Sequence, residues 1–115
     1  MAAKKIVATF FATENGAEPV RLWLKSLAKP DRVAIGEDVA DVEFEWPIGL
    51  PVCRPLGNGL YEVRTTLKNR IARVIFVIEG SSMVILHGFI KKSQSTPKPD
   101  LDLARKRLQA YRRSI

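Results

Sequence analysis

A chain of 115 residues and 12.9 kDa holds one compact domain with a single hydrophobic core. Hydrophobic residues make up 46% of it and charged residues 27%, which excludes an intrinsically disordered or membrane-spanning protein. The net charge of +7 favours a polyanionic partner, and we expect one soluble domain over residues 1–115.

The first half of the chain predicts one strand and two helices. Lys4–Phe11 is rich in β-branched and aromatic residues and predicts an opening strand. Ala17–Ala28 carries apolar residues at helical spacing and predicts an amphipathic helix. A second helix is expected to start near Pro30 and to end at Trp46, because Pro47 cannot continue the hydrogen-bond ladder. The two helices are expected to form a hairpin.

The second half predicts four strands and a final helix. A proline-rich loop leads into a short edge strand at Val52–Leu56, and a Gly-Asn-Gly turn follows it. Leu60–Leu67 and Arg70–Ile78 are expected to pair antiparallel. Ser82–Lys92 is apolar almost throughout, which predicts a central strand covered on both faces. Asp100–Arg113 has the spacing of a basic amphipathic helix.

The order of these elements, β-α-α-β-β-β-β-α, predicts an α+β fold. A twisted, mainly antiparallel sheet should carry the N-terminal helix hairpin and the C-terminal helix on its apolar surface. The spacing of turns and helices shows no repeat and no domain boundary.

Positive charge is concentrated in the second half of the chain. Residues 1–53 contain six Lys and Arg against eight Asp and Glu, a net charge of −2, whereas residues 54–115 contain thirteen against four, a net charge of +9. Such a surface attracts nucleic acid most often and acidic proteins next, although excess charge also serves solubility alone.

The sequence carries no secretion, membrane or cofactor signature. Residues 1–8 lack the apolar run of a secretory signal, so a cytoplasmic location without membrane association is expected. One Cys and one His cannot form a structural zinc site, and no phosphate-loop lysine is present, so neither a metal nor another cofactor is expected. Cys53 is interpreted as a small buried hydrophobic residue rather than a nucleophile.

The strongest candidate for chemistry is a group of cations on three adjacent strands. Alternation places Glu62 and Arg64 on one face of their strand, and Arg73 lies among apolar residues on the next strand. Lys91 and Lys92 end the third. Arg64, Arg73 and one of the lysines meet if the strands pair in sequence order, but a register shift of one residue would separate the two arginines.

Convergent Arg and Lys side chains can bind an RNA backbone and stabilise the charge that develops when a ribose 2′-hydroxyl attacks the adjacent phosphate. Lys91 or Lys92 is a candidate base if neighbouring cations lower its pKa, and Glu62 is a second candidate. The alternative is that these are solvated charges at strand ends that only contact phosphate. His87, Trp23 and Trp46 are interpreted as structural residues, and His87 is expected to be buried and hydrogen-bonded.

Several segments of the second half resemble a known family. They are Gly59–Arg64, Arg70–Phe76, Ile85–Pro97 and the helical segment Asp102–Leu108. The run Phe-Ile-Lys-Lys-Ser-x-x-Thr-Pro within the third segment is the most specific part. Together they resemble the phage-derived, HigB-like branch of the RelE/ParE toxin superfamily.

This resemblance implies a RelE-like fold and a toxin of a type II toxin–antitoxin system. Such a toxin is a metal-independent endoribonuclease that cuts mRNA on the ribosome and is neutralised by a helix-turn-helix antitoxin. By position in the matching motifs, it implies that Arg64, Arg73, Lys91 and Lys92 are catalytic. Further residues expected to bind RNA are Arg54, Lys68, Arg70 and Lys98.

The sequence departs from the family in its proton-transfer groups. Several related toxins end the last strand or the chain with a His or Tyr, whereas here no such residue follows Lys92 before Tyr111. The general acid and base therefore stay open. Two other functions also stay open, a non-enzymatic ParE-like toxin that binds DNA gyrase and an inactive phage-derived nucleic-acid-binding remnant.

Overall fold

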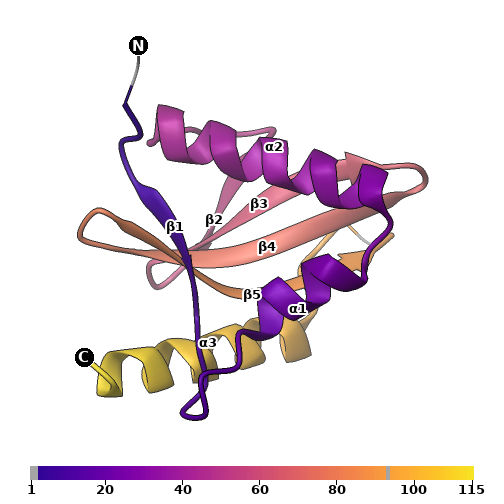
Figure 1. The fold of residues 1–115 in the computed structure, drawn as a ribbon. Coiled ribbons are helices and arrows are strands. Elements are labelled where there is room, and N and C mark those ends of the chain that lie inside the picture. Colours follow the sequence, from indigo (N-terminus) through magenta and orange to yellow (C-terminus); the bar gives the residue numbers. More distant parts are fainter. Residues whose placement is uncertain (1–2, 93) are drawn as a thin grey trace.

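The computed structural model describes residues 3–92 and 94–115, so Met1, Ala2 and Ser93 lie outside the described residues. The predicted α+β fold and its element order are confirmed (Figure 1). The elements are β1 (Val7–Phe10), α1 (Pro19–Ser26), α2 (Lys29–Glu45), β2 (Cys53–Gly57), β3 (Leu60–Leu67), β4 (Arg70–Glu79), β5 (Ser82–Lys91) and α3 (Lys98–Arg113).

The five strands form one sheet in the order β1-β5-β4-β3-β2. Strands β2 to β5 pair antiparallel in sequence order, as predicted, and β1 alone pairs in parallel, with β5. The apolar strand β5 therefore lies inside the sheet, and β4 occupies its centre. Consecutive pairing of β3, β4 and β5 brings the basic residues of these strands close together.

Helices α1 and α2 cover one face of the sheet (Figure 1). Alternate residues of β3 and β4, such as Val63, Val74 and Phe76, point into a core that also contains Ile35 and Val42 of α2. Both tryptophans pack as expected. Trp46 makes edge-to-face contacts with Tyr61 and Phe76, and the Trp23 ring lies against Gly88.

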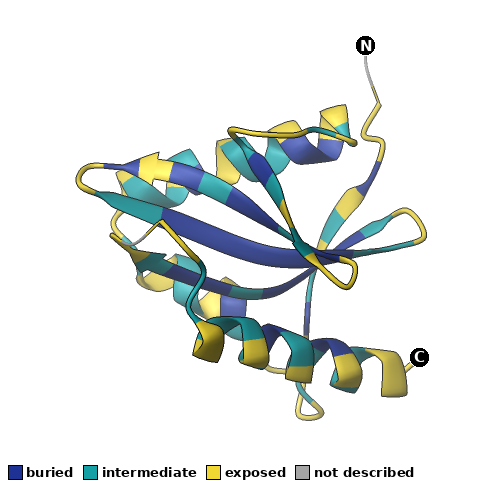
Figure 2. Ribbon diagram, turned by 180° about the vertical axis from the view of Figure 1, so that it is seen from behind, coloured by how far each residue is buried: buried dark blue, intermediate teal, exposed yellow. Residues whose placement is uncertain are grey.

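Helix α3 covers only part of the opposite face. Its Ala104 and Leu108 pack on an apolar cluster that includes Leu60, Ile75 and Leu86. In Figure 2, α3 runs along the bottom of the view and β4 crosses the middle as a continuous buried stretch. The remaining part of this face, toward the β3–β4 turn, carries the charged residues.

The bounds of α3 and β1 differ from the predictions. Helix α3 starts at Lys98 rather than Asp100, because Pro99 is accommodated in its first turn. Strand β1 is shorter than Lys4–Phe11, because the Lys5 and Ile6 N–H groups bind the Glu43 carbonyl of α2 instead of a strand. Within the described ranges, no helix combines the length and the apolar composition needed to cross a membrane.

Candidate active site: a buried carboxylate among cations

The strand register places the predicted cations on the face that α3 covers in part. Arg64 of β3 lies directly opposite Arg73 of β4, and Arg73 lies opposite Phe89 of β5. Lys91 pairs with Ile71, two residues along β4 from Arg73, so its side chain is on the same face. The sequence did not fix the strand register, and the observed register brings Arg64, Arg73 and Lys91 together.

Glu62 lies at the centre of this group. Its side chain is fully buried, and its carboxylate forms ion pairs with three arginines. The distances are 3.3 Å to Arg54 Nε, 3.8 Å to Arg64 Nη1 and 3.8 Å to Arg73 Nε. Burying a carboxylate is costly unless cations and hydrogen bonds compensate it, which explains why the three arginines converge here. We call the four cations Arg54, Arg64, Arg73 and Lys91, together with the central Glu62, the cation cluster.

The linker between β5 and α3 lies against the cation cluster. The Thr96 hydroxyl donates a 2.6 Å hydrogen bond to Glu62 Oε1. Arg64 donates a 3.2 Å hydrogen bond to Gln94 Oε1. Gln94 and Thr96 both belong to the Lys-Lys-Ser-x-x-Thr-Pro segment, so this segment supplies two contacts to the site in addition to Lys91.

The cations differ in how far a ligand can reach them. Arg73 is fully buried, whereas the exposed fraction of the side chain is 16% for Arg64, 33% for Arg54 and 48% for Lys91. Burial lowers the pKa of Arg73, and the neighbouring Glu62 opposes this effect. A ligand can therefore contact Arg54, Arg64 and Lys91 directly. Arg73 lies beneath them and contributes its charge without direct contact.

A second carboxylate, Asp100, borders the site from the first turn of α3. Its Oδ1 lies 2.7 Å from His87 Nε2, and its Oδ2 lies 3.4 Å from Lys91 Nζ. His87 is thus hydrogen-bonded as predicted, and it is mostly rather than fully buried. Sequence reasoning missed Asp100, Gln94 and Thr96, since Asp100 was interpreted only as a residue at a helix start.

The charges of the site do not cancel. Four cations, Arg54, Arg64, Arg73 and Lys91, face two carboxylates, Glu62 and Asp100, which leaves a net charge of +2. The Phe89 ring lies beneath this group, with Arg73 and Lys91 at 5.9 and 6.0 Å from its centroid. A partly exposed site with two uncompensated positive charges suits a phosphate group.

Comparison with known families assigns the chain. The profile of the family described as phage-derived protein Gp49-like (DUF891) matches residues 22–109, which include the whole cation cluster. The protein belongs to this family. No curated protein matches the chain. The phage-derived relationship expected from the sequence is confirmed at this level, and the finer placement within the RelE/ParE superfamily stays a prediction.

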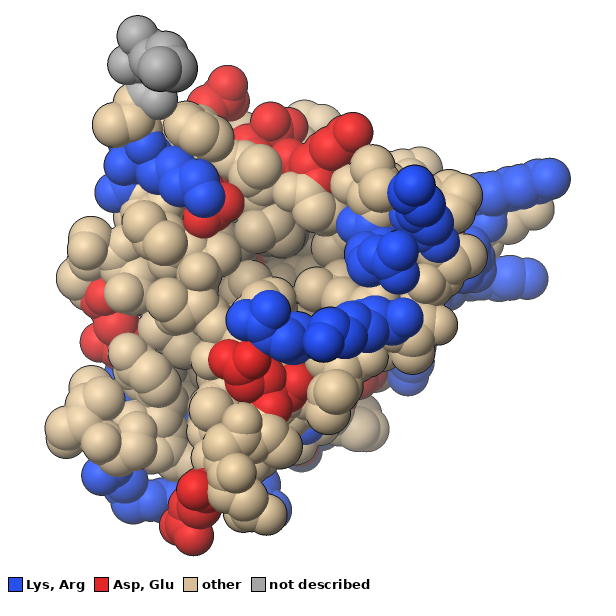
Figure 3. Space-filling model, in the orientation of Figure 1, with Lys and Arg blue, Asp and Glu red and all other residues tan. Residues whose placement is uncertain are grey.

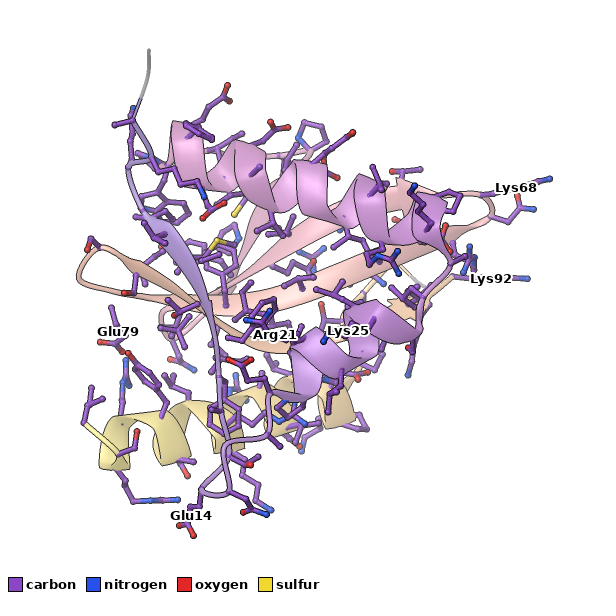
Figure 4. All side chains as sticks on the ribbon, in the orientation of Figure 1. Glu14, Arg21, Lys25, Lys68, Glu79 and Lys92 are labelled. Carbon is purple, nitrogen blue, oxygen red and sulfur yellow. The ribbon has the colours of Figure 1, made fainter. Side chains whose placement is uncertain are left out.

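Other predicted site residues of this Gp49-like protein lie outside the cation cluster. Lys92 and Lys68 project outward beyond the end of β5 and at the β3–β4 turn (Figure 4). Arg70 lies on the opposite face and pairs with Asp31 of α2 at 3.0 Å. Lys98 is exposed at the start of α3 and pairs with Asp102. The role of these four residues in RNA binding or catalysis stays a prediction.

Two further interpretations are resolved by the geometry of the Gp49-like protein. Glu62 is poorly placed as a base, because it is fully buried and its oxygens are held by three arginines and Thr96. Cys53 is buried as expected, and burial, together with the charge of Glu62, raises its pKa to about 11, which makes it a poor nucleophile.

Basic side chains gather at one end of the molecular surface. Figure 3 shows acidic side chains along α2 and basic side chains gathered at the end of the molecule where Figure 4 labels Lys68 and Lys92. An approaching polyanion is therefore directed toward the β3–β4 turn and away from α2. The cation cluster lies on the sheet face next to this basic end.

Proposed function

We propose that this Gp49-like protein is the toxin of a type II toxin–antitoxin system and that it inhibits translation by cleaving mRNA on the ribosome. The observation that supports the proposal best is the opposed pair Arg64 and Arg73 around the buried Glu62. A protein that needed only a stable core would gain little from such a group, because buried ion pairs contribute little to stability. The surplus positive charge favours a site for phosphate.

The proposed reaction is attack of a ribose 2′-hydroxyl on the adjacent phosphate. The 2′-hydroxyl releases its proton to solvent as the new 2′-O–P bond forms, and the bond from phosphorus to the 5′-oxygen breaks. Protonation of the leaving oxygen then gives a 2′,3′-cyclic phosphate and a 5′-hydroxyl. The phosphate gains a second negative charge in the transition state, and Arg54 and Arg64 can stabilise it. The nucleophile belongs to the substrate, so we propose a metal-independent reaction.

Lys91 is the candidate for proton transfer. It is the most exposed residue of the cation cluster, and Asp100 holds its ammonium group from the side of α3. His87 binds the other oxygen of Asp100 and fixes the orientation of this carboxylate. Lys91 can therefore protonate the leaving 5′-oxygen, and Asp100 and His87 act as positioning residues for it.

The proposed partners follow from the proposed toxin activity. A toxin must be neutralised in the cell that makes it, and we propose that a helix-turn-helix antitoxin encoded beside it does this. The ribosome and its mRNA are the proposed targets, which places the protein in the cytoplasm. The basic half of the chain, with a net charge of +9 over residues 54–115, favours contact with ribosomal RNA.

The proposal is tested by primer extension on a reporter mRNA in a purified translation system, with and without ribosomes. We expect cleavage by the wild type only when ribosomes are present. Arg64→Ala should reduce the rate about 10²- to 10³-fold, since it removes one donor to the transition state. Arg21→Ala is the matched control, because Arg21 lies on α1 outside the cation cluster and pairs with Glu18.

Two results would contradict the proposed ribonuclease. Absence of cleavage by a folded wild-type protein would favour the inactive remnant. Growth arrest accompanied by DNA damage, without inhibition of translation, would favour the gyrase-binding toxin. Equal cleavage by Arg64→Ala and Arg21→Ala would leave an RNA-cleaving protein whose active site lies elsewhere.

A further inference from the structure

A cavity of about 570 Å³ lies beside Arg64, at the end of the cation cluster nearest the β3–β4 turn. Its six lining residues come from the α2–β2 loop, from β3 and β4, and from the linker before α3. They are Leu50, Pro51, Arg64, Thr66, Ile71 and Gln94. Arg64 is the residue shared with the cation cluster, so a molecule bound through phosphate there would place its neighbouring groups in this cavity.

The strands and the α2–β2 loop form the walls of this cavity. Thr66 and Ile71 lie directly opposite each other, two residues along the strands from the Arg64–Arg73 pair, so all four residues share one face. The loop is fixed beside them by a 2.7 Å hydrogen bond from the Arg64 N–H to the Val52 carbonyl. This bond holds the preceding Leu50 and Pro51 against the site.

The residues that line the cavity suit a flat, mainly apolar ligand with polar edges. Leu50, Pro51 and Ile71 provide apolar surface, and Leu50 is 67% exposed, so a ligand can reach it. Gln94 adds a specific donor. Arg64 can only donate, so it binds the amide oxygen of Gln94, and the amide nitrogen stays able to donate to a ligand.

We propose that this cavity binds the nucleobase next to the scissile phosphate. Leu50 and Ile71 contact the faces of the base, and Gln94 and Thr66 bind its edge, where every nucleobase carries acceptor atoms. Arg64 then contacts the phosphate of the same nucleotide. The inference rests on the proposed function, since it takes the polyanion at Arg64 to be RNA.

The test is a titration of the full-length protein, followed by NMR, with the four ribonucleoside 5′-monophosphates and, separately, with ribose 5-phosphate. We expect the methyl signals of Leu50 and Ile71 to shift saturably with the nucleotides. Ribose 5-phosphate, which has no base, should shift the Arg64 guanidinium signal and leave both methyl signals in place. Methyl signals that respond equally to both probes, or to neither, would overturn the inference.

Two variants with similar exposure give a matched comparison. Leu50→Ala should weaken nucleotide binding about fivefold or more, because a base loses its contact surface. Leu22→Ala on α1 should bind as the wild type does, since Leu22 is 58% exposed and does not line the cavity. Equal affinities of the two variants would contradict the assignment.

Failure of this inference is distinguishable from failure of the proposed function. The titration requires no ribosome and no cleavage, so an inactive protein would still report on the cavity. If ribosome-dependent cleavage occurs and the methyl signals do not respond, the enzyme assignment stands and the base-binding cavity is wrong.

Discussion

The two faces of the sheet are built from alternate residues of the same strands, yet they differ in kind. On the face covered by α1 and α2, Val63, Val74 and Phe76 pack into a continuous apolar core. On the face that α3 covers in part, Glu62 and Arg73 occupy the neighbouring positions and are equally buried. Burial by itself therefore does not identify which face is structural.

The difference lies in what the buried residues contribute. Apolar side chains stabilise the fold in proportion to the area removed from water. The attraction between buried charges is largely offset by the free energy of removing them from water. A group such as Glu62 with its arginines therefore contributes little net stability. One face thus holds the protein together, and the other uses that rigid support to keep charged groups in place.

The largest expected effect comes from removing the centre of the charged face. Glu62→Ala leaves three arginines facing each other around a buried space, and we expect a loss of about 3–5 kcal/mol in the free energy of unfolding. Phe76→Ala should cost about 3–5 kcal/mol through loss of packing on the other face.

Inorganic phosphate separates these two losses, because only Glu62→Ala adds a further uncompensated positive charge to the site. Chemical denaturation at increasing phosphate concentration should restore part of the stability of Glu62→Ala, since an anion that binds the folded state stabilises it. Phe76→Ala should respond as the wild type does. An identical response of both variants would remove the proposed distinction between the two faces.

The next effect concerns Cys53, whose thiol is buried on the apolar side next to β3. Its pKa is raised from 9.0 to about 11, so the folded state favours the protonated thiol. The resulting stabilisation is complete below pH 9 and is lost as the pH rises toward about 11. It amounts to roughly 2–3 kcal/mol at 1.36 kcal/mol for each pKa unit.

Denaturation at pH 8 and pH 11 measures this contribution. The wild type should lose more stability over this interval than Cys53→Ala, which cannot ionise and serves as the control for titration of other groups. Parallel losses in the two proteins would show that the thiol does not titrate differently in the fold.

A smaller effect is expected at the contact between α1 and β5. A Cβ added at Gly88 would lie 2.4 Å from the Trp23 ring, so Gly88→Ala forces the helix or the ring to move. We expect a loss of about 1–3 kcal/mol in thermal or chemical unfolding. Trp23→Leu combined with Gly88→Ala should recover part of it, and an additive loss in the double variant would contradict the proposed clash.

The sequence was sufficient to predict the order of the elements and the shared face of Glu62 and Arg64. Periodicity and turn residues are local signals, and they carry this information directly. Neither the opposition of Arg64 to Arg73 nor the burial of Glu62 could be derived, because both depend on pairing between strands. Asp100 was missed for the same reason, since α3 brings it beside β5.

The central claim is that one face of the sheet forms an active site for RNA cleavage, and adjacent lysines test it most directly. Lys91 lies in the cation cluster with Asp100, whereas Lys92 projects away from the sheet (Figure 4). The measurement is the rate of ribosome-dependent mRNA cleavage by the wild type, Lys91→Ala and Lys92→Ala. Our account predicts a loss of about 10²-fold or more for Lys91→Ala and a clearly smaller loss for Lys92→Ala. Equal losses in the two variants, or a greater loss for Lys92→Ala, would contradict it.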